Sequence, residues 1–152
     1  MLPRDVEVVA EIGYDHGEIL LRAAKKLPPP ARIIGVEKQI GAADRFRSRN
    51  AHNPWARRIE LRCGSGLTAL ADDELHTLVL AGLGEARVCD ILGADPQRLC
   101  MVQDILCMPL QRQGQLGEFL RGQGFAVYAE DTAIERGRYY PLTHFRNSLR
   151  VS

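Results

Sequence analysis

The sequence predicts a single α/β domain built on a mostly parallel sheet with helices on both faces. Strand-like apolar runs alternate with helix-like runs along the chain, and glycine-containing turns follow several of the strands. The length of 152 residues is that of one ordinary domain, and the 45% of hydrophobic residues is typical of a globular chain. No segment rich in Gly, Ser or Pro divides the sequence, so we expect residues 1–152 to form one domain.

Each strand is predicted from a short run of β-branched or other apolar residues, and each helix from apolar residues spaced three or four apart. The expected strands are residues 6–12, 32–37, 58–62, 75–81, 100–103 (the start of a fifth strand), 125–129 and 139–145. The expected helices are residues 16–27, 40–50, 86–93 and 110–122. Three consecutive prolines at 28–30 end the first helix, because proline cannot donate a backbone hydrogen bond and restricts the residue before it.

Strands that alternate with helices indicate βαβ units, whose right-handed crossovers place helices on both faces of a parallel sheet. The last two expected strands lie close in sequence, which favours an antiparallel pair at the end of the chain. In such open sheets, ligands bind outside the carboxyl ends of the strands, where the strand order reverses. Functional residues are therefore expected in the loops that follow the first four strands.

Composition and charge point to no particular partner. The formal net charge is +1, which by itself indicates neither a nucleic acid nor a membrane. The four cysteines form no CxxC pair and the histidines complete no zinc spacing, so we expect buried free thiols and no metal. No stretch has the apolar length of a membrane span, and the first residues have no leader-like pattern, so the cytoplasm is the expected location.

The loop after the first strand combines two glycines with an acidic residue. Gly13 can form a tight turn and Gly17 allows close backbone approach, although the segment is not a full GxGxxG. An ordinary strand-to-helix turn with Asp15 as the helix cap explains it about equally well. The Asp15 carboxylate would repel a pyrophosphate, whereas a cationic sulfonium without phosphate would suit it.

The next three loops strengthen a nucleoside-binding interpretation. Glu37 ends the second strand 24 residues beyond Gly13, where an acidic residue accepts hydrogen bonds from ribose hydroxyls. A solvated strand-end glutamate is the alternative. A glycine turn at residues 64–66 follows the third strand, and another at residues 82–84 follows the fourth. Glycine turns at the ends of several strands would let the backbone of each turn come close to one flat, extended ligand.

These residues resemble a known family. Residues 11–17 read E-I-G-Y-D-H-G, which resembles the D-I-G-S-D-H-A signature of the bacterial TrmK family, class I methyltransferases that methylate N1 of an adenine in tRNA. The other matching segments are G-S-G-L at residues 64–67, L-A-G-L-G at residues 80–84, Val102-Gln103 as the start of an L-Q-P-N motif, and A-I-E-R at residues 133–136. The resemblance covers roughly residues 8–145.

The resemblance implies a Rossmann-like class I methyltransferase fold with a seven-stranded sheet and S-adenosylmethionine as cofactor. The implied cofactor-binding residues are Glu11, Gly13, Tyr14, His16, Glu37, Lys38, Gly64, Ser65, Gly66, Ala81, Gly82 and Leu83. The implied catalytic residue is Asp15, which would accept a hydrogen bond from the exocyclic amine of the base; Asp104, expected after the fifth strand, is a second candidate. Substrate contacts are expected from Gln103, Arg136, Arg138 and Tyr139, with tRNA as partner.

The sequence also departs from the family. Tyr14 replaces a small residue beside the cofactor, Glu85 replaces a glycine of the fourth loop, and Asp104 stands where a proline follows the family's glutamine. The sequence ends at Ser152, so we expect the family's C-terminal helical extension to be missing. These departures leave open a catalytically silent cofactor- or protein-binding module and a small-molecule methyltransferase. A nicotinamide oxidoreductase is disfavoured by Asp15, and the sequence does not indicate the oligomeric state.

Overall fold

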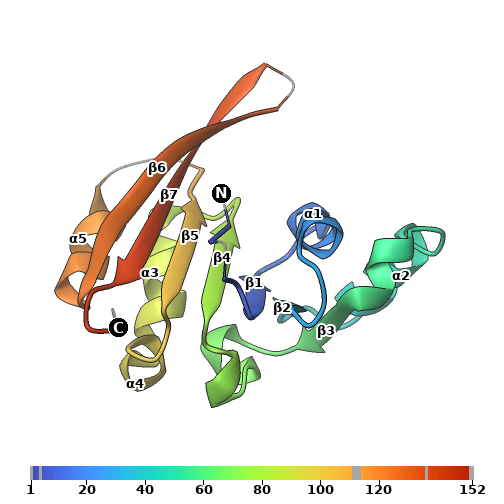
Figure 1. Cartoon of the computed structure of the whole chain (residues 1–152), viewed down its shortest axis with the longest axis horizontal. Helices are drawn as coiled ribbons and strands as arrows, with labels where there is room; N and C mark the ends of the chain where they lie inside the picture. Colours follow the sequence, from blue (N-terminus) through green and yellow to red (C-terminus); the bar gives the residue numbers. More distant parts are fainter. Residues whose placement is uncertain (1, 4, 111–113, 136, 151–152) are drawn as a thin grey trace.

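The structure is a computed structural model that describes residues 2–3, 5–110, 114–135 and 137–150. Within these residues, seven strands form one sheet with the order β3-β2-β1-β4-β5-β7-β6 (Figure 1). The strands are β1 (Val8–Ile12), β2 (Arg32–Glu37), β3 (Ile59–Cys63), β4 (Thr77–Ala81), β5 (Asp104–Met108), β6 (Phe125–Glu135) and β7 (Arg138–Asn147). The strands β1 to β5 are parallel and β7 is antiparallel to β5 and β6, which confirms the predicted α/β fold and its final antiparallel pair.

Helices cover both faces of the sheet. The α-helices are α1 (Glu18–Lys26), α2 (Ala42–Arg49), α3 (Glu85–Gly93), α4 (Pro96–Leu99) and α5 (Gln115–Gly122), and the 3₁₀ helices are η1 (Pro54–Arg58), η2 (Gly66–Ala69) and η3 (Asp72–Glu74). Apolar residues of α1 and α2 form one core cluster with one face of the sheet, and those of α3, α4 and α5 form another with the opposite face. None of the helices in the described ranges combines the length and apolar character needed to cross a bilayer.

The strand order reverses between β1 and β4. The strands β2 and then β3 lie on one side of β1. The next strand, β4, lies on the other side of β1, where Thr77 pairs with Val9. Because the crossovers leave in opposite directions, the carboxyl ends of β1 and β4 flank a natural crevice. The first four predicted strand ends therefore lie along one edge of the sheet.

Three helices begin later than predicted, and each begins after a glycine. Gly17, Gly41 and Gly114 all have positive φ values, of 71°, 84° and 82°, and α1, α2 and α5 start at the next residue. A residue with left-handed backbone angles cannot be part of a right-handed α-helix. The apolar spacing in the sequence therefore begins a few residues before each helix does. Residues 111–113 of the helix predicted at 110–122 lie outside the described residues.

The prediction that a fifth strand begins at residues 100–103 is wrong. Cys100 is the C-cap of α4, which starts at Pro96 and is capped by the side chain of Asp95. The backbone N–H groups of Gln103 and Asp104 both donate to the His76 carbonyl, and the ladder with β4 starts at Asp104. The fifth strand is therefore the apolar segment Asp104–Met108.

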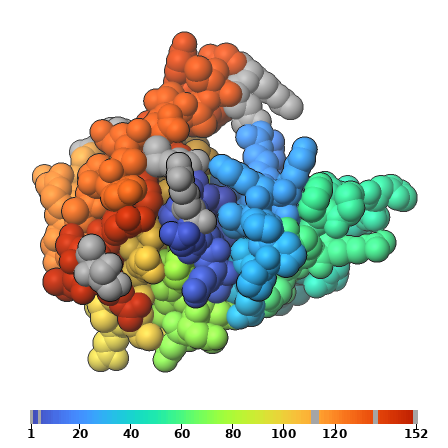
Figure 2. All heavy atoms as spheres, in the orientation of Figure 1, coloured from blue at the N-terminus to red at the C-terminus, as the bar shows by residue number. Residues whose placement is uncertain are grey.

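The last two strands are longer than predicted and form an arm. The pairing of β7 with β5 ends at Thr143, which lies opposite Cys107. Residues 138–142 of β7 pair only with β6. The hairpin consequently extends past the carboxyl end of β5, and Figures 1 and 2 show it rising from the body of the molecule. This arm stands over the same edge of the sheet as the carboxyl ends of β1 and β4.

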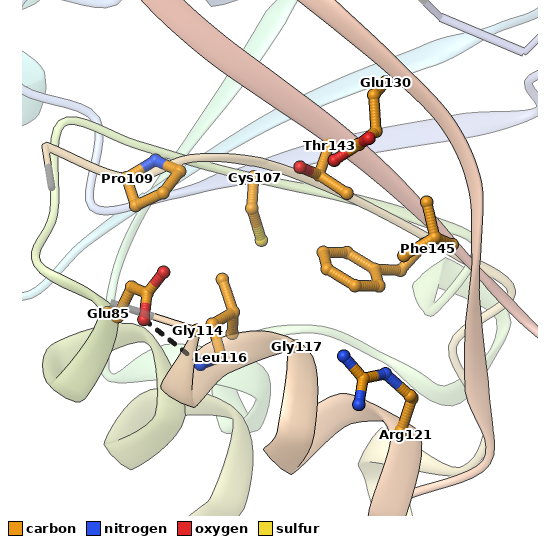
Figure 3. Close-up of a pocket in the computed structure, with 11 residues that line it drawn as sticks. Glu85, Cys107, Pro109, Gly114, Leu116, Gly117, Arg121, Glu130, Thr143 and Phe145 are labelled. Carbon is orange, nitrogen blue, oxygen red and sulfur yellow. Dashed lines mark hydrogen bonds between the residues drawn. The ribbon is translucent and has the colours of Figure 1, made fainter. Parts of the chain in front are cut away.

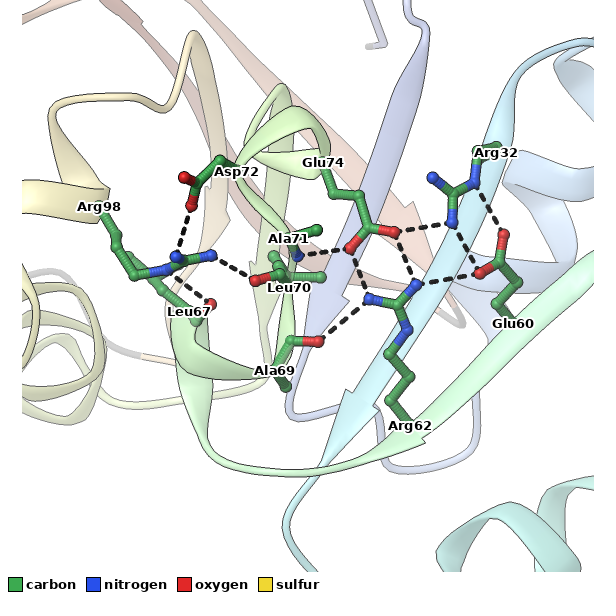
Figure 4. A network of polar contacts seen from close by, with 10 residues as sticks. All are labelled: Arg32, Glu60, Arg62, Leu67, Ala69, Leu70, Ala71, Asp72, Glu74 and Arg98. Carbon is green, nitrogen blue, oxygen red and sulfur yellow. Dashed lines mark hydrogen bonds and ion pairs between the residues drawn. The ribbon is translucent and has the colours of Figure 1, made fainter.

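A network of ion pairs fixes the connection between β3 and β4 (Figure 4). Glu74, which is 3% exposed, accepts hydrogen bonds from Arg62 at 2.5 and 2.7 Å and from Arg32 at 2.7 Å. The Arg62 guanidinium is the main reason that the pKa of Glu74 falls to about 2. From the other side, Arg98 donates to Asp72 at 2.6 Å. This connection carries the glycine turn at residues 64–66, so the network holds that turn at the sheet edge.

Candidate active site

A cleft of about 640 Å³ crosses the carboxyl edge of the sheet, within the size range of ligand sites. A smaller pocket of about 120 Å³ adjoins it and shares Gly13, Glu37 and Leu83 with it. Among the predicted cofactor residues, Glu11, Gly13, Tyr14, His16, Glu37, Ala81, Gly82 and Leu83 line the cleft, and Lys38, Gly64, Ser65 and Gly66 line the smaller pocket. Residues from four separate loops are thus brought together at the point where the strand order reverses.

The turn after β1 requires both of its glycines. Gly13 has a φ of +77°, and its N–H donates to the Val36 carbonyl at 2.8 Å, which ties the turn to β2. At Gly17, with a φ of +71°, a Cβ would lie 2.3 Å from the Phe46 ring of α2. This close approach lets α1 and α2 pack together beside the cleft.

The floor of the cleft contains a buried carboxylate. The Glu11 side chain is 6% exposed, and its Oε2 atom has no hydrogen-bond partner among the described residues. Burial raises the pKa of this carboxyl from 4.5 to about 7, although a hydrogen bond from the Leu20 backbone acts in the opposite direction. An unpartnered buried oxygen is costly, so Glu11 is suited to a ligand that donates a hydrogen bond or carries positive charge.

Glu37 and Tyr14 form the wall on the β2 side. Glu37 is half-buried at the end of β2, and its Oε1 accepts a hydrogen bond from the Gln39 N–H at 3.1 Å. Tyr14 is 1% exposed, lies against Gly35 and meets Phe46 edge-on at 6.2 Å. Burial, followed by the Glu37 charge, raises the pKa of Tyr14. Tyr14 therefore fills space between α1 and β2, and it narrows the cleft from that side.

His16 lies between Asp15 and α2 and contacts both. The His16 Nε2 atom lies 3.2 Å from Asp15 Oδ2, and its Nδ1 atom lies 2.9 Å from the Arg49 guanidinium. Because arginine can only donate, Nδ1 must accept, which leaves the proton of a neutral imidazole on Nε2, facing Asp15. The Arg49 contact thereby favours the tautomer whose Nε2 N–H lies on the side of Asp15, a residue that lines the cleft.

The turn after β4 leaves open space. Gly82 has a φ of +69°, and a Cβ added at Gly82 or Gly84 would meet no atom within 4 Å. The Gly82 N–H donates to the Met108 carbonyl at 3.1 Å, which fixes the turn against β5. Glycine at these positions leaves room for a ligand to approach the backbone.

The predicted location of Asp104 after strand five is wrong. Asp104 is the first residue of β5, at the amino edge of the sheet and far from the cleft lining. It is fully buried and bonds His144 at 2.5 Å and Arg146 at 2.9 Å. Burial alone would raise its pKa, but hydrogen bonds from these two partners lower it. Asp104 thus ties β5 to β7.

The same error affects Gln103, which precedes β5 and does not line the cleft. The L-Q-P-N resemblance was therefore placed at the wrong end of the strand. The segment that follows β5 into the cleft is Met108, Pro109 and Leu110. A proline directly after an apolar run was the signal in the sequence that could have identified this segment.

The hairpin contributes different residues from those predicted. Arg138 and Tyr139 are exposed and do not line the cleft, whereas Ala133, Ile134 and Tyr140 do. Arg136 lies outside the described residues. Three arginines also line the cleft: Arg22, which the sequence did not indicate, and Arg45 and Arg49, for which the sequence left a phosphate-binding face and an ordinary solvated helix face equally open.

A separate cavity of about 170 Å³ lies behind β5, between α5 and the hairpin (Figure 3). Glu85, at the start of α3, accepts a hydrogen bond from the Leu116 N–H at 3.3 Å. The Cys107 thiol in this cavity is fully buried, which raises its pKa strongly. The four cysteines are free, but Cys63 and Cys100 are exposed, so the expectation of buried thiols is wrong for these two.

The comparisons with known proteins agree with this geometry. A family model described as "Methyltransferase domain" matches residues 1–143. This chain belongs to the methyltransferase-domain family. No curated protein matches it by sequence.

Solved methyltransferase structures share the fold. TrmK of B. subtilis is 22% identical, with a TM-score of 0.76 over 91% of this chain and 59% of that protein. TrmK of M. capricolum, in complex with S-adenosyl-homocysteine, is 15% identical, with a TM-score of 0.74 over 94% of this chain and 63% of that one. Sp1610 of Streptococcus pneumoniae, in complex with S-adenosyl-L-methionine, is 20% identical, with a TM-score of 0.79 over 97% and 69%.

These likenesses confirm the Rossmann-like methyltransferase fold that the TrmK resemblance implied. This methyltransferase domain spans about two thirds of the length of the proteins compared. In its described residues, no group of three or more His, Cys, Asp or Glu side chains is arranged to hold a metal ion.

Proposed function

We propose that this methyltransferase domain uses S-adenosylmethionine to methylate a base nitrogen of RNA, with adenine N1 of tRNA as the acceptor. The observation that carries the proposal is the cleft at the reversal of strand order, with the unpartnered Glu11 oxygen on its floor and Glu37 at one end. As part of the same proposal, we place this activity in the cytoplasm. The TrmK resemblance and the fold shared with TrmK proteins support this choice of acceptor.

The residues present fit a cationic nucleoside cofactor. Glu37, at the end of β2, is suited to accept hydrogen bonds from ribose hydroxyls. Glu11 offers a buried, unpartnered oxygen to an ammonium group, and the open space at Gly82 and Gly84 admits an extended ligand. The smaller pocket, lined by Lys38 and the turn at residues 64–66, would receive the adenine.

When bound, the cofactor supplies an electrophilic methyl group on a positively charged sulfur. Adenine N1 has an in-plane lone pair, so it would accept this group without a side chain acting as a base. The work of the protein is therefore positioning and charge stabilisation. A carboxylate beside the base would stabilise the positive charge that the methylated ring carries.

Asp15 is the side chain that we assign to this task. It lies in the loop after β1, lines the cleft and is oriented by His16, which in turn is held by Arg49. A carboxylate in that position accepts a hydrogen bond from the exocyclic amine of adenine, whose acidity rises as the ring becomes cationic. His16 and Arg49 act as positioning residues, because they reach the base only through Asp15.

The arginines on α1 and α2 support an RNA acceptor. Arg45 donates to the Gln39 side-chain oxygen and Arg49 contacts the His16 ring, so in the described part of the chain neither guanidinium is paired with a carboxylate. Guanidinium groups of this kind at a cleft mouth suit phosphates. A base that enters the cleft must leave its stack, which costs a few kcal/mol.

The test is methyl transfer from labelled cofactor to tRNA transcribed in vitro without modifications. We expect the wild type to label this RNA, with binding that weakens as salt rises. Asp15→Ala should lower kcat by about 100-fold or more, while its affinity for S-adenosylhomocysteine stays within about threefold of that of the wild type. Asp73→Ala, at an exposed carboxylate outside the cleft, is the matched control. Tight cofactor binding with no transfer to any RNA would instead favour a silent binding module.

A further inference from the structure

The cleft has two chemically different halves. Over β1 and β2 it is lined by charged side chains, among them Glu11, Asp15 and Glu37. Over β5 and the hairpin it is lined by Met108, Pro109, Leu110, Ala133, Ile134 and Tyr140. The charged half is the one suited to the cofactor, which leaves the apolar half, with its single aromatic ring, for the methyl acceptor.

Tyr140 is the aromatic residue of the apolar half. It lies on the part of β7 that extends past β5, and among the described strands it pairs only with Ala133 on β6. The side chain directly opposite Tyr140 on β6 is therefore only a methyl group. Tyr140 is half-buried at this position, so its ring has both support and an accessible surface.

The neighbouring tyrosine provides the contrast. Successive residues of a strand point to opposite faces of the sheet, so Tyr139 and Tyr140 face opposite ways. Tyr139 is 73% exposed and is absent from the cleft lining. Tyr140 shares its face with Leu142, which packs against the core cluster of α1 and α2 on the side where the cleft opens.

We propose that the methyl-accepting base stacks on the Tyr140 ring, so that this residue selects a planar aromatic acceptor. The inference rests on the proposed function and names the acceptor half of the same cleft. Unstacked bases in RNA-binding sites are commonly held on aromatic side chains. Apolar residues at the end of β5 then line the site beneath the base, and Asp15 on the β1 loop faces it from the charged half.

The experiment compares Tyr140→Ala, Tyr140→Phe and the matched control Tyr139→Ala. Two quantities are measured: kcat and KM for unmodified tRNA transcripts, and the Kd of the S-adenosylhomocysteine-saturated protein for fluorescein-labelled transcripts. Calorimetry with S-adenosylhomocysteine verifies that each variant is folded and retains its cofactor site. That affinity should stay within about twofold of the wild type in all three, because the stacking contact lies outside the charged half.

We expect Tyr140→Ala to raise KM and Kd for tRNA by about 10- to 100-fold, the effect of losing one base–aromatic stack. Tyr140→Phe should stay within about threefold, because the ring is kept, and so should Tyr139→Ala. Equal losses in Tyr139→Ala and Tyr140→Ala, or no loss in Tyr140→Ala, would overturn the inference while leaving methyl transfer intact.

The two proposals can fail separately. If the wild type binds tRNA in a Tyr140-dependent way but transfers no methyl group, the stacking site stands and the proposed activity fails. If the wild type transfers methyl groups with no dependence on Tyr140, the activity stands and the stacking site fails. A wild type that does not bind tRNA at all would overturn both.

Discussion

Replacing Glu11 with glutamine should stabilise the free protein and impair its site. The side chain is 6% exposed, and burial raises its pKa from 4.5 to about 7. A rise of that size corresponds to about 3 kcal/mol of preference for the protonated form in the folded state. Glutamine has nearly the same shape and no charge, so Glu11→Gln removes the cost of holding a carboxylate there.

The sign of the pH dependence follows from the direction of the shift. Between about pH 4.5 and pH 7 the folded protein holds the Glu11 proton and the unfolded chain does not, so stability falls as the pH rises through this window. Above about pH 7 the penalty is constant. Glu11→Gln should therefore match the wild type near pH 4 and exceed its stability by up to about 3 kcal/mol at pH 8.

Urea unfolding at pH 4, 6 and 8 measures this difference, because effects of other titrating groups cancel between variant and wild type. The same variant should bind S-adenosylhomocysteine more weakly, and it should lose the rise in affinity that the wild type shows as the pH increases through about 7. A variant that is no more stable than the wild type at pH 8 would show that Glu11 is neither desolvated nor unpartnered.

Three further predictions concern the framework around the site. Glu74→Gln should lower the free energy of unfolding by about 3 kcal/mol at pH 7, as measured by urea unfolding. The difference from the wild type should vanish as the pH falls from about 4.5 toward 2, because the pKa of Glu74 in the folded state is lowered to about 2. Gly17→Ala should lower stability by about 2–4 kcal/mol, more than Gly114→Ala, since both have positive φ but only the first meets the Phe46 ring; equal losses would refute the packing argument. Cys107 should resist thiol reagents in the native protein while the two exposed cysteines react, as mass spectrometry of labelled peptides can show.

The sequence predicted the sheet and the meeting of the loops after β1 to β4 at one edge, because both depend on local signals. The turn at Gly13 and the acidic end of β2 at Glu37 are recognisable from residue type and spacing alone. Parallel strands bring their carboxyl ends to one edge regardless of side-chain detail. Residues from distant loops therefore meet as predicted once the alternation of strands and helices is recognised.

The side of the cleft formed by β5 and the hairpin could not be predicted in the same way, because it depends on long-range pairing. Asp104 belongs inside a buried strand only because His144 and Arg146, about 40 residues later, pair with its carboxylate. Tyr140 rather than Tyr139 lines the cleft because of the register of the hairpin, and a slip of one residue would exchange their faces. Neither the pairing partners of Asp104 nor the register of the hairpin can be recognised from the neighbouring residues in the sequence.

The central claim is that a nucleoside cofactor lies across the carboxyl ends of β2, β1 and β4, with its ribose held by Glu37. Isothermal calorimetry of S-adenosylhomocysteine at pH 8 tests it most directly, with the wild type, Glu37→Ala and the exposed control Glu7→Ala. We expect micromolar binding by the wild type and the control, about −8 kcal/mol, and at least a tenfold weaker Kd for Glu37→Ala. Absence of binding to the wild type, or equal affinity in all three proteins, would contradict the account.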